Sequence, residues 1–404
     1  MKLLLCVAAL GDTSTATIVT RNDFLGESPV ITKPIASNAP IELPALPEEP
    51  LVSVLIGNYN YGHYIGRTID SALNQTYAKL EVVVCDDGST DDSADVVQRY
   101  VERDQRVKLV RQPNAGHPAA YGTAYRNSRG DILCILDSDD LFAPHKIESL
   151  VRCFRSGSGI GYVIHPLIMV DAEDRQIQPL TLLDSFEEGF IAEKVVRRGG
   201  RWRSMTASGI SFRRELAPYV YPVPDGIYAD VMFNTVLPLV TRVAVVRDYL
   251  GYYRLHGRNM TGEIRNHSSI EDSIRSIRKY LGCLEGALDA VNERIAALNL
   301  GVPPLQLRDN LDYQMRTFAL SLFTGSTPIG RRIRQYAALV SAIARDDLYR
   351  RKHKCALLAG YGLAAVVPAV LGTRVIEAIH MPNRLKYLLL RGMRPPELGS
   401  TGNA

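Results

Sequence analysis

The most informative stretch of the sequence is a run of five apolar residues followed at once by a cluster of carboxylates. It reads Ile132-Leu133-Cys134-Ile135-Leu136-Asp137-Ser138-Asp139-Asp140. A continuous apolar run is typical of a strand that is covered on both faces. Asp137 and Asp139 follow its carboxyl end, where open α/β sheets bind ligands, and they can share one hard cation if the chain turns between them. The alternative is a polar loop that caps the helix expected near Pro144.

Strands and helices alternate in the region before this run. Apolar runs predict strands at 51–56, 80–85, 107–110 and 132–136. Apolar spacing predicts a helix through Ile65, Ile69 and Leu73, and further helices over 92–101 and 119–129. This order predicts an α/β fold with a mainly parallel (mixed) sheet flanked by helices. Neither a Gly-x-Gly-x-x-Gly after the first strand nor a P-loop motif occurs, so a Rossmann dinucleotide site and a P-loop are disfavoured.

Composition narrows the classes of function. The chain has 404 residues, 46% of them hydrophobic, so it can bury a sizeable core. Its six cysteines form no Cys-x-x-Cys pair, which favours reduced thiols in the cytoplasm over a zinc site. A net charge of +4 does not indicate nucleic-acid binding. Residues 270–404 nevertheless carry 19 Lys and Arg against 11 Asp and Glu, a basic surplus that suits an anionic surface.

The first 50 residues are predicted to be a flexible lead-in. Lys2 and the apolar residues 3–10 resemble the start of a signal peptide. Eight apolar residues are at the short limit for a secretory core, and no clear small-x-small cleavage site follows, so export is not expected. Residues 11–50 are rich in Thr, Ser, Pro and Glu, as flexible segments are.

Five motifs in register give the chain a resemblance to a known family. Taken together over roughly residues 51–155, they look like the family 2 glycosyltransferases of the GT-A fold. The motifs are Val52-Ser53-Val54-Leu55-Ile56-Gly57-Asn58-Tyr59-Asn60, Ser71-Ala72-Leu73-Asn74-Gln75-Thr76-Tyr77, Val82-Val83-Val84-Cys85-Asp86-Asp87-Gly88-Ser89-Thr90-Asp91, Asn114-Ala115-Gly116, and Arg129-Gly130-Asp131-Ile132 through Asp140.

The resemblance implies an inverting, metal-dependent enzyme. Such an enzyme moves a hexosyl or N-acetylhexosaminyl group from a nucleotide-diphosphate sugar, with a UDP-sugar favoured here, and uses Mn²⁺ or Mg²⁺ to neutralise the diphosphate. By resemblance, the metal residues are Asp137, Asp139 and His256. The nucleotide-sugar-binding residues are Gly57, Tyr59, Asp87, Asn114, Asp137 and Arg254. Two departures affect the nucleotide contacts: the family often has Pro at Gly57, and often Asn or Arg-Asn near Tyr121-Gly122.

Asp230 is the catalytic residue that the resemblance implies. An inverting displacement needs a carboxylate that takes the proton of the acceptor hydroxyl. The family often has a Glu-Asp pair here, and in this chain Ala229 replaces its first member. The alternative for Asp230 is a helix N-cap, and Asp225 is the second candidate base.

Two further motifs leave alternatives open. Residues 197–203 are rich in Arg and hold the only tryptophan, Trp202, so they form either a solvated loop or an acceptor surface for a phosphate or a sugar ring. Arg254 and His256 are two apart on a predicted strand and so share one face. His256 has a structural role as its alternative.

The C-terminal region is predicted to be helical. Helices are expected from Ser269 onward, over 311–323 and over 329–344, with a break at 301–304. Residues 355–371 carry no charge and follow the basic residues 350–354. This pattern favours a helix lying in a membrane interface, and the alternatives are a buried helical hairpin or an oligomer contact.

The sequence therefore predicts a lead-in at 1–50, a GT-A domain at 51–262 and a helical, possibly membrane-associated region at 263–404. We expect a cytoplasmic enzyme at the inner face of the membrane, whose acceptor is a surface polysaccharide or a lipid-linked oligosaccharide and whose partners include no nucleic acid. A nucleotidyltransferase is the alternative enzyme, although Gly57-Asn58-Tyr59-Asn60 lacks the basic phosphate loop that it needs. A non-catalytic nucleotide-sugar binding or scaffold protein is the alternative outside enzymes.

Overall fold

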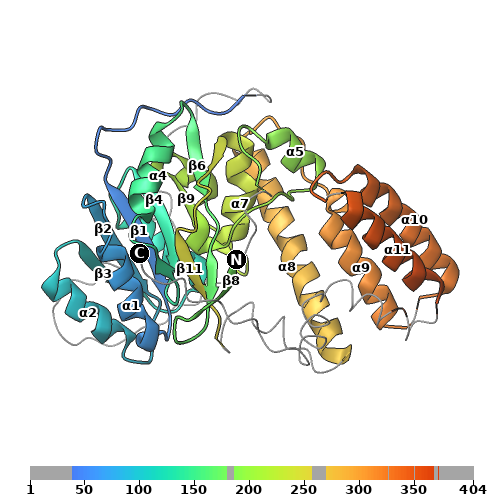
Figure 1. Ribbon diagram of the computed structural model, residues 1–404, viewed down its shortest axis with the longest axis horizontal. Helices are drawn as coiled ribbons and strands as arrows, with labels where there is room; N and C mark the ends of the chain where they lie inside the picture. Colours follow the sequence, from blue (N-terminus) through green and yellow to red (C-terminus); the bar gives the residue numbers. More distant parts are fainter. Residues whose placement is uncertain are drawn as a thin grey trace, which may run out of the picture. The chain divides into compact units, whose positions relative to one another are not determined.

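The structure is a computed structural model that describes residues 39–179, 186–256, 270–325, 327–349, 351–367 and 372. Its first half alternates strands and helices in the order that the sequence predicts (Figure 1). The elements are β1 Val52–Asn58, α1 Gly62–Leu73, β2 Leu80–Asp86, α2 Ser93–Arg103, β3 Val107–Arg111, α3 His117–Arg126 and β4 Ile132–Asp137.

Shorter strands and further helices follow β4. They are β5 Leu141–Phe142, α4 Lys146–Arg155, β6 Ile160–Ile164, β7 Ile168–Val170, β8 Gln176–Pro179, α5 Ala192–Arg197, β9 Ile210–Arg213, α6 Ala217–Val220, α7 Ala229–Val240, β10 Arg242–Val245 and β11 Gly251–Arg254.

The main sheet has seven strands in the order β10-β6-β9-β4-β1-β2-β3. The strands β4, β1, β2 and β3 run parallel, whereas β9 is antiparallel to both β4 and β6. A smaller sheet has the order β5-β11-β7-β8. The fold is therefore a mixed α/β sheet flanked by helices, as predicted.

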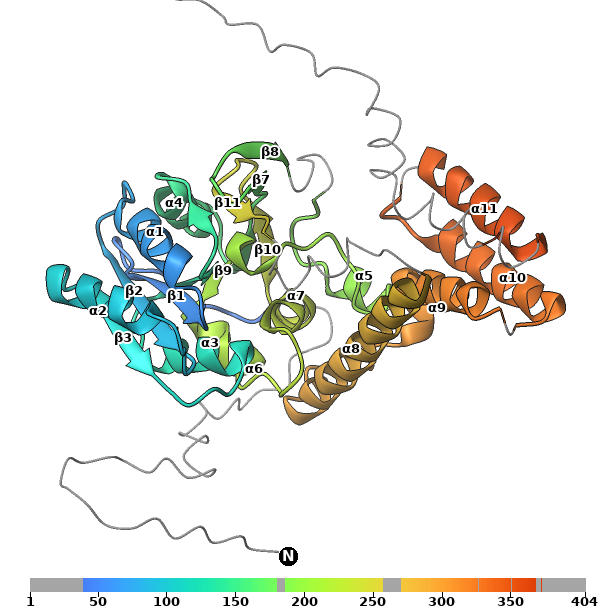
Figure 2. The same cartoon turned by 90° about the horizontal axis from the view of Figure 1, so that it is seen from below.

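Helices cover both faces of the main sheet. Helices α1, α2 and α4 lie on one face, and α3 and α7 lie on the other (Figure 2). Every residue of β1 and β2 is buried, as expected for strands that are covered on both sides. On the α1 side, Val54 and Ile56 pack against Ile65 and Ile69 of α1. Cys85 and Cys134 are buried free thiols within β2 and β4.

The C-terminal region is helical, as predicted. Its helices are α8 Ile270–Ala297, α9 Leu311–Phe323, α10 Ile329–Arg345 and α11 Arg351–Val366. Helix α8 contacts α7 on one side and α9 on the other, so it joins this region to the sheet domain. The last three helices share a core of their own, formed by Leu311, Met315, Phe318, Ala319, Leu322, Leu339, Ile343, Tyr361, Ala364 and Ala365.

Part of the predicted lead-in contacts the sheet domain. The amide of Ile41 donates to the carbonyl oxygen of Val240 (2.8 Å), and the Tyr77 hydroxyl donates to the carbonyl oxygen of Pro50 (2.7 Å). Residues 1–38 and 368–371 lie outside the described residues, so the predictions for them stay predictions, as do the domain boundaries. Within the described ranges, none of the helices combines the length and apolar character needed to cross a membrane.

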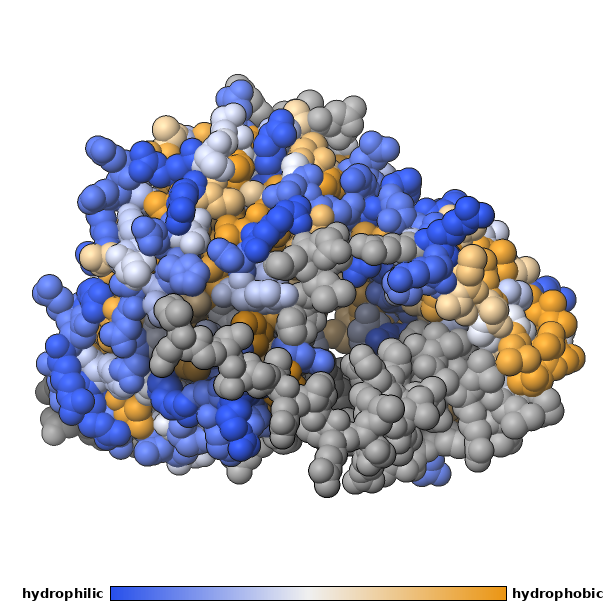
Figure 3. Space-filling view, in the orientation of Figure 1, coloured by the Kyte–Doolittle hydropathy of each residue, from blue (hydrophilic) through white to orange (hydrophobic). Residues whose placement is uncertain are grey.

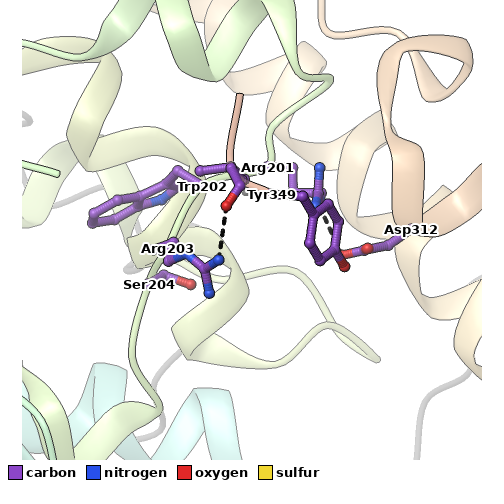
Figure 4. Close-up of a pocket in the computed structure, with 7 residues that line it drawn as sticks. Arg201, Trp202, Arg203, Ser204, Asp312 and Tyr349 are labelled. Atoms are coloured by element: carbon purple, nitrogen blue, oxygen red, sulfur yellow. Dashed lines mark hydrogen bonds and ion pairs between the residues drawn. The ribbon is translucent and has the colours of Figure 1, made fainter. Parts of the chain in front are cut away.

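The arginine-rich stretch at 197–203 binds the C-terminal region. The Arg201 Nε lies 2.9 Å from Asp312 Oδ2, and its Nη1 pairs with Asp346. Arg198 donates from Nε to Asp347 Oδ1 (2.5 Å). The Arg203 guanidinium donates to the carbonyl oxygen of Leu348 (2.8 Å), and both residues line a hollow of about 270 Å³ (Figure 4). These contacts join the stretch to acids more than 100 residues later, so it is not a freely solvated loop.

Trp202 is fixed within this interface. Its side chain is 6% exposed, and its Nε1 donates to the carbonyl oxygen of Asn234 on α7 (2.5 Å). Trp202 is one of the residues that line the hollow, and its ring points away from Tyr349 and Asp312 (Figure 4). A buried tryptophan with a satisfied N–H is a packing residue, so a sugar stacked on its face is disfavoured.

We expect Arg201→Ala to lower the free energy of unfolding by about 3 to 5 kcal/mol, because the change leaves the buried Asp346 carboxylate without its partner. Arg197→Ala is the matched control: Arg197 and Asp347 form an exposed pair, which contributes about 0 to 1 kcal/mol. Urea unfolding of both variants measures the difference. Equal losses in the two variants would contradict a stabilising role for the Arg201 pair.

Candidate active site

The carboxyl ends of three parallel strands meet at one edge of the sheet. Gly57 of β1 pairs in register with Cys85 of β2 on one side and with Asp137 of β4 on the other. A side chain at Gly57 would press on Ala120 of α3, since its Cβ would lie 3.2 Å from the Ala120 Cβ. Gly57 therefore lets α3 pack closely on β1. Tyr59 follows at the end of β1 and is 44% exposed.

Asp87 holds the loop that contains Asn114. One carboxylate oxygen accepts from the amide of Ala115 (2.9 Å) and from Gln112 Nε2 (2.7 Å), and the other accepts from the amide of Gly116 (2.8 Å). The Asp87 side chain is buried, whereas Asn114 is exposed beside it. Asp87 thus positions the Asn114 loop, and its predicted contact with a nucleotide base stays a prediction.

We expect Asp87→Ala to destabilise the fold by about 1 to 3 kcal/mol, because it leaves the amides of Ala115 and Gly116 without their acceptor. The exposed Asn114→Ala should leave the unfolding free energy unchanged within about 0.5 kcal/mol. Thermal or urea unfolding separates the two variants. An Asp87→Ala protein as stable as the parent would argue against this positioning role.

Asp137 is held by two side chains of α3 that the sequence analysis did not identify. Its Oδ1 accepts from the Tyr121 hydroxyl (2.6 Å) and lies 3.2 Å from His117 Nε2. Burial acts to raise the pKa of Asp137, but the hydrogen bond and charge of His117 outweigh it and lower that pKa. His117 and Tyr121 are four residues apart, so they share one helix face. That spacing, directly after Asn114-Ala115-Gly116, is the signal that could have found them.

Asp139 and Asp140 are held by β11 and by the residues after it. His256 Nε2 lies 2.8 Å from Asp139 Oδ2, and Arg254 Nε donates to the Asp139 carbonyl oxygen (2.6 Å). The amide of Arg254 donates to Asp140 Oδ1 (2.9 Å). Arg254 and His256 therefore both contact Asp139, but the predicted strand ends at Arg254, so His256 reaches Asp139 from the residues that follow β11. The Arg254 side chain is fully buried and also pairs with Asp174. Arg254 therefore holds the loop at 137–140, hereafter the acidic loop, in place.

Negative charge is concentrated at this edge. Burial, followed by the charges of Asp139 and Asp137, raises the pKa of Asp140 well above its usual range. The Asp140 Oδ2 atom is buried and has no hydrogen-bond partner. A divalent cation would relieve this repulsion, and carboxylate oxygens are ligands that Mn²⁺ and Mg²⁺ prefer, so the chemistry of these side chains suits such an ion.

The predicted metal residues have separate partners in the structure. His256 is bonded to Asp139, whereas Asp137 is held separately by His117 and Tyr121. Among the described residues, no three His, Cys, Asp or Glu side chains are arranged to hold a metal. The metal role of Asp137, Asp139 and His256 therefore stays a prediction.

Asp230 lies in the first turn of α7 and is half-buried. It is not the helix cap, because the N-cap residue is Tyr228 and no side chain caps this end. Burial, followed by the nearby charge of Asp137, raises the pKa of Asp230 to about 6. Asp225 is exposed in the turn that precedes the helix. Of the two candidate bases, Asp230 is therefore the one whose pKa is shifted toward neutral pH by burial and by the charge of Asp137.

Comparison with known proteins identifies the family of the chain. Residues 53–217 match the model of Glycosyl transferase family 2. An uncharacterized glycosyltransferase of Nostoc sp. is 30% identical over 269 residues, which cover 65% of this chain and 81% of that protein. Chondroitin synthase of Escherichia coli is 40% identical over 137 residues, which cover 34% of this chain and only 20% of that protein.

Among solved structures, the chain matches that of S. aureus TarS residues 1–349 in complex with UDP-GlcNAc. It is 16% identical, with a TM-score of 0.47, and the match covers 83% of this chain and 92% of that one. The family assignment rests on the sequence matches, because the Nostoc relative is covered over four fifths of its length. The chain belongs to glycosyl transferase family 2 and is a glycosyltransferase.

Proposed function

We propose that this glycosyltransferase moves a hexosyl or N-acetylhexosaminyl group from a nucleotide-diphosphate sugar to an acceptor hydroxyl, with inversion at the anomeric carbon. The donor we favour is a UDP-sugar, and the acceptor is a polysaccharide or a lipid-linked oligosaccharide. Family membership argues against the nucleotidyltransferase alternative. The acidic residues of the site are all present, which argues against a silent scaffold protein.

One observation carries the proposal: the half-buried carboxylate of Asp230 has its pKa raised to about 6 by burial and by the nearby charge of Asp137. In the proposed step, the acceptor oxygen bonds to the anomeric carbon while the bond from that carbon to the diphosphate oxygen breaks. Asp230 takes the proton of the acceptor hydroxyl, and the nucleoside diphosphate leaves with the electron pair. Attack from the side opposite the leaving group inverts the anomeric centre.

The other site residues bind and orient in this proposal. Tyr59 and the Asn114 loop contact the nucleotide, and Asp87 keeps that loop in place through the amides of Ala115 and Gly116. Arg254 holds the acidic loop by its bonds to Asp139 and Asp140. Asp137, Asp139 and His256 would hold Mn²⁺ or Mg²⁺, and that ion supplies positive charge to the diphosphate leaving group.

A panel of nucleotide-diphosphate sugars tests the proposal. The purified full chain is titrated calorimetrically with UDP-, GDP- and dTDP-sugars in the presence of Mn²⁺, and binding of one nucleotide class is expected. Transfer from that donor to a set of oligosaccharide acceptors is then followed, and proton NMR of the first product gives its anomeric configuration. A product with the donor's own configuration would overturn the inverting mechanism. Failure of a folded protein to bind any of the sugars would overturn the donor class.

A further inference from the structure

The C-terminal helices α10 and α11 expose large apolar side chains. In the described part of the chain, the large hydrophobic residues that lie more than 40% exposed are Tyr59, Ile177, Ile329, Ile333, Leu363 and Val366. The last four belong to α10 and α11. Exposed apolar residues scattered singly need no explanation, but a group on one helix pair indicates an interaction surface.

These four residues lie at one end of the helix pair. Arg332 in the first turn of α10 donates to the carbonyl oxygen of Val367, just after the last turn of α11, at 3.0 Å. At the opposite end, Lys354 Nζ donates to the carbonyl oxygen of Ala344 (2.9 Å), so the two helices run antiparallel. Figure 3 shows apolar residues gathered where Figure 1 places α10 and α11.

Helix α11 is apolar on both of its sides. Its inner side is buried through Tyr361, Ala364 and Ala365. Its outer side is exposed and carries no charge beyond its first turn, through Cys355, Ala356, Ala359, Leu363 and Val366. A helix that is apolar all round is normally covered all round. We therefore expect a partner to cover the exposed apolar side of α11.

The charges around this surface are almost all positive. Exposed basic residues lie on the same two helices: Arg331 and Arg334 near the start of α10, and Arg351 and Lys352 in the first turn of α11, at the opposite end of the pair from Leu363 and Val366. The sequence from 327 to 367 contains only two acids, Asp346 and Asp347. Both are paired with arginines of the stretch at 197–201. A suitable partner for this surface therefore offers both an apolar region for the exposed side chains and negative charges for the exposed arginines and lysine.

We infer that α10 and α11 dock on an anionic phospholipid surface through the apolar residues Ile329, Ile333, Leu363 and Val366, with the cations Arg331 and Arg334 at the same end of the helix pair, hereafter the hairpin face. An amphipathic element with an apolar side and basic flanks lies in the headgroup region of a bilayer, with its apolar residues inserted and its cations at the lipid phosphates. A second copy of the chain is a less suitable partner, because a two-fold contact of this face with itself would bring the arginines of the two copies together.

Vesicle co-sedimentation tests the inference with the full chain. Vesicles of phosphatidylcholine alone are compared with vesicles of equal parts phosphatidylcholine and phosphatidylglycerol. The protein is expected to bind the anionic vesicles at least about tenfold more tightly than the neutral ones, and added salt should weaken this binding.

Two variants divide the contributions to vesicle binding. Leu363→Glu combined with Val366→Glu should reduce binding to anionic vesicles by about tenfold or more, and Arg331→Glu combined with Arg334→Glu should do the same. All four side chains are exposed, so no buried packing is lost. The matched control is Ile177→Glu, an equally exposed apolar residue on β8, which should bind as the parent does.

Each outcome decides the question. Unchanged vesicle binding by the Leu363/Val366 variant would overturn the inference. The inference would also be overturned if the parent protein bound neither kind of vesicle. In that case, light scattering that finds a dimer for the parent and a monomer for the Leu363/Val366 variant would identify the hairpin face as a self-association surface. Binding of nucleotide sugars is measured separately, so failure of the membrane inference is distinguishable from failure of the proposed function.

Discussion

The Asp230→Asn protein is expected to lose about 10² to 10⁴-fold in kcat while its binding of the donor is unchanged, because an amide cannot take the proton of the acceptor hydroxyl. In the parent enzyme, activity should fall as the pH falls through about 6, where Asp230 becomes protonated. Steady-state kinetics across pH, with the donor and acceptor identified by the panel, provide the measurement.

Asp225→Asn is the matched control for this experiment. Asp225 lies only five residues earlier, is exposed, and was the second candidate base. Its amide variant should retain the kcat and the pH profile of the parent. The opposite pattern, with Asp225→Asn inactive and Asp230→Asn active, would transfer the role of base to Asp225.

The same substitution should stabilise the folded protein at neutral pH. Burial and the charge of Asp137 raise the pKa of Asp230 from 3.8 to about 6, so the folded state holds this proton more tightly than the unfolded chain does. Stability from this group is therefore present below about pH 4 and is lost as the pH rises to about 6. Asparagine carries no charge, so Asp230→Asn should gain about 1 to 3 kcal/mol at pH 7. Urea unfolding at pH 4 and at pH 7 measures this gain, and a variant less stable than the parent at pH 7 would contradict it.

The Asp139→Ala protein is expected to lose metal-dependent binding of the nucleotide diphosphate by about 100-fold or more, since one of two carboxylates for the cation is removed. The parent should show the same loss when EDTA is added. Calorimetric titration of the nucleotide diphosphate with and without Mn²⁺ compares the Asp139→Ala protein with the parent. The control is Asp289→Ala, which removes an exposed acid of α8. If Asp139→Ala binds the nucleotide as the parent does, the metal role of Asp139 is wrong.

A second variant, His256→Ala, tests whether the contact between His256 and Asp139 is structural. His256 Nε2 lies 2.8 Å from Asp139 Oδ2. If that contact only stabilises the fold, His256→Ala should lower the unfolding free energy and leave nucleotide binding intact. If His256 is a metal residue, the variant should weaken binding in Mn²⁺ and leave binding in EDTA unchanged. The two readouts therefore separate a ligand from a packing residue.

The sequence by itself was sufficient for the order of strands and helices and for the placement of the acidic groups at strand ends. Continuous apolar runs such as 132–136 predict buried strands because a strand covered on both faces has no polar side. Helical spacing predicts α8 to α10 because residues three and four apart share a face. The positions of Asp87 and Asp137 at one edge follow from parallel strands, whose carboxyl ends lie together.

Tertiary structure alone decided what those groups touch. Both oxygens of Asp87 are bonded to residues 112–116, Asp137 is held by His117 and Tyr121, and Arg201 pairs with acids more than 100 residues later. Periodicity reports which side of a helix or strand is buried, but it says nothing about which distant side chain meets it. Such pairs depend on the register and packing of elements from separate parts of the chain, and these are settled only when the whole core forms.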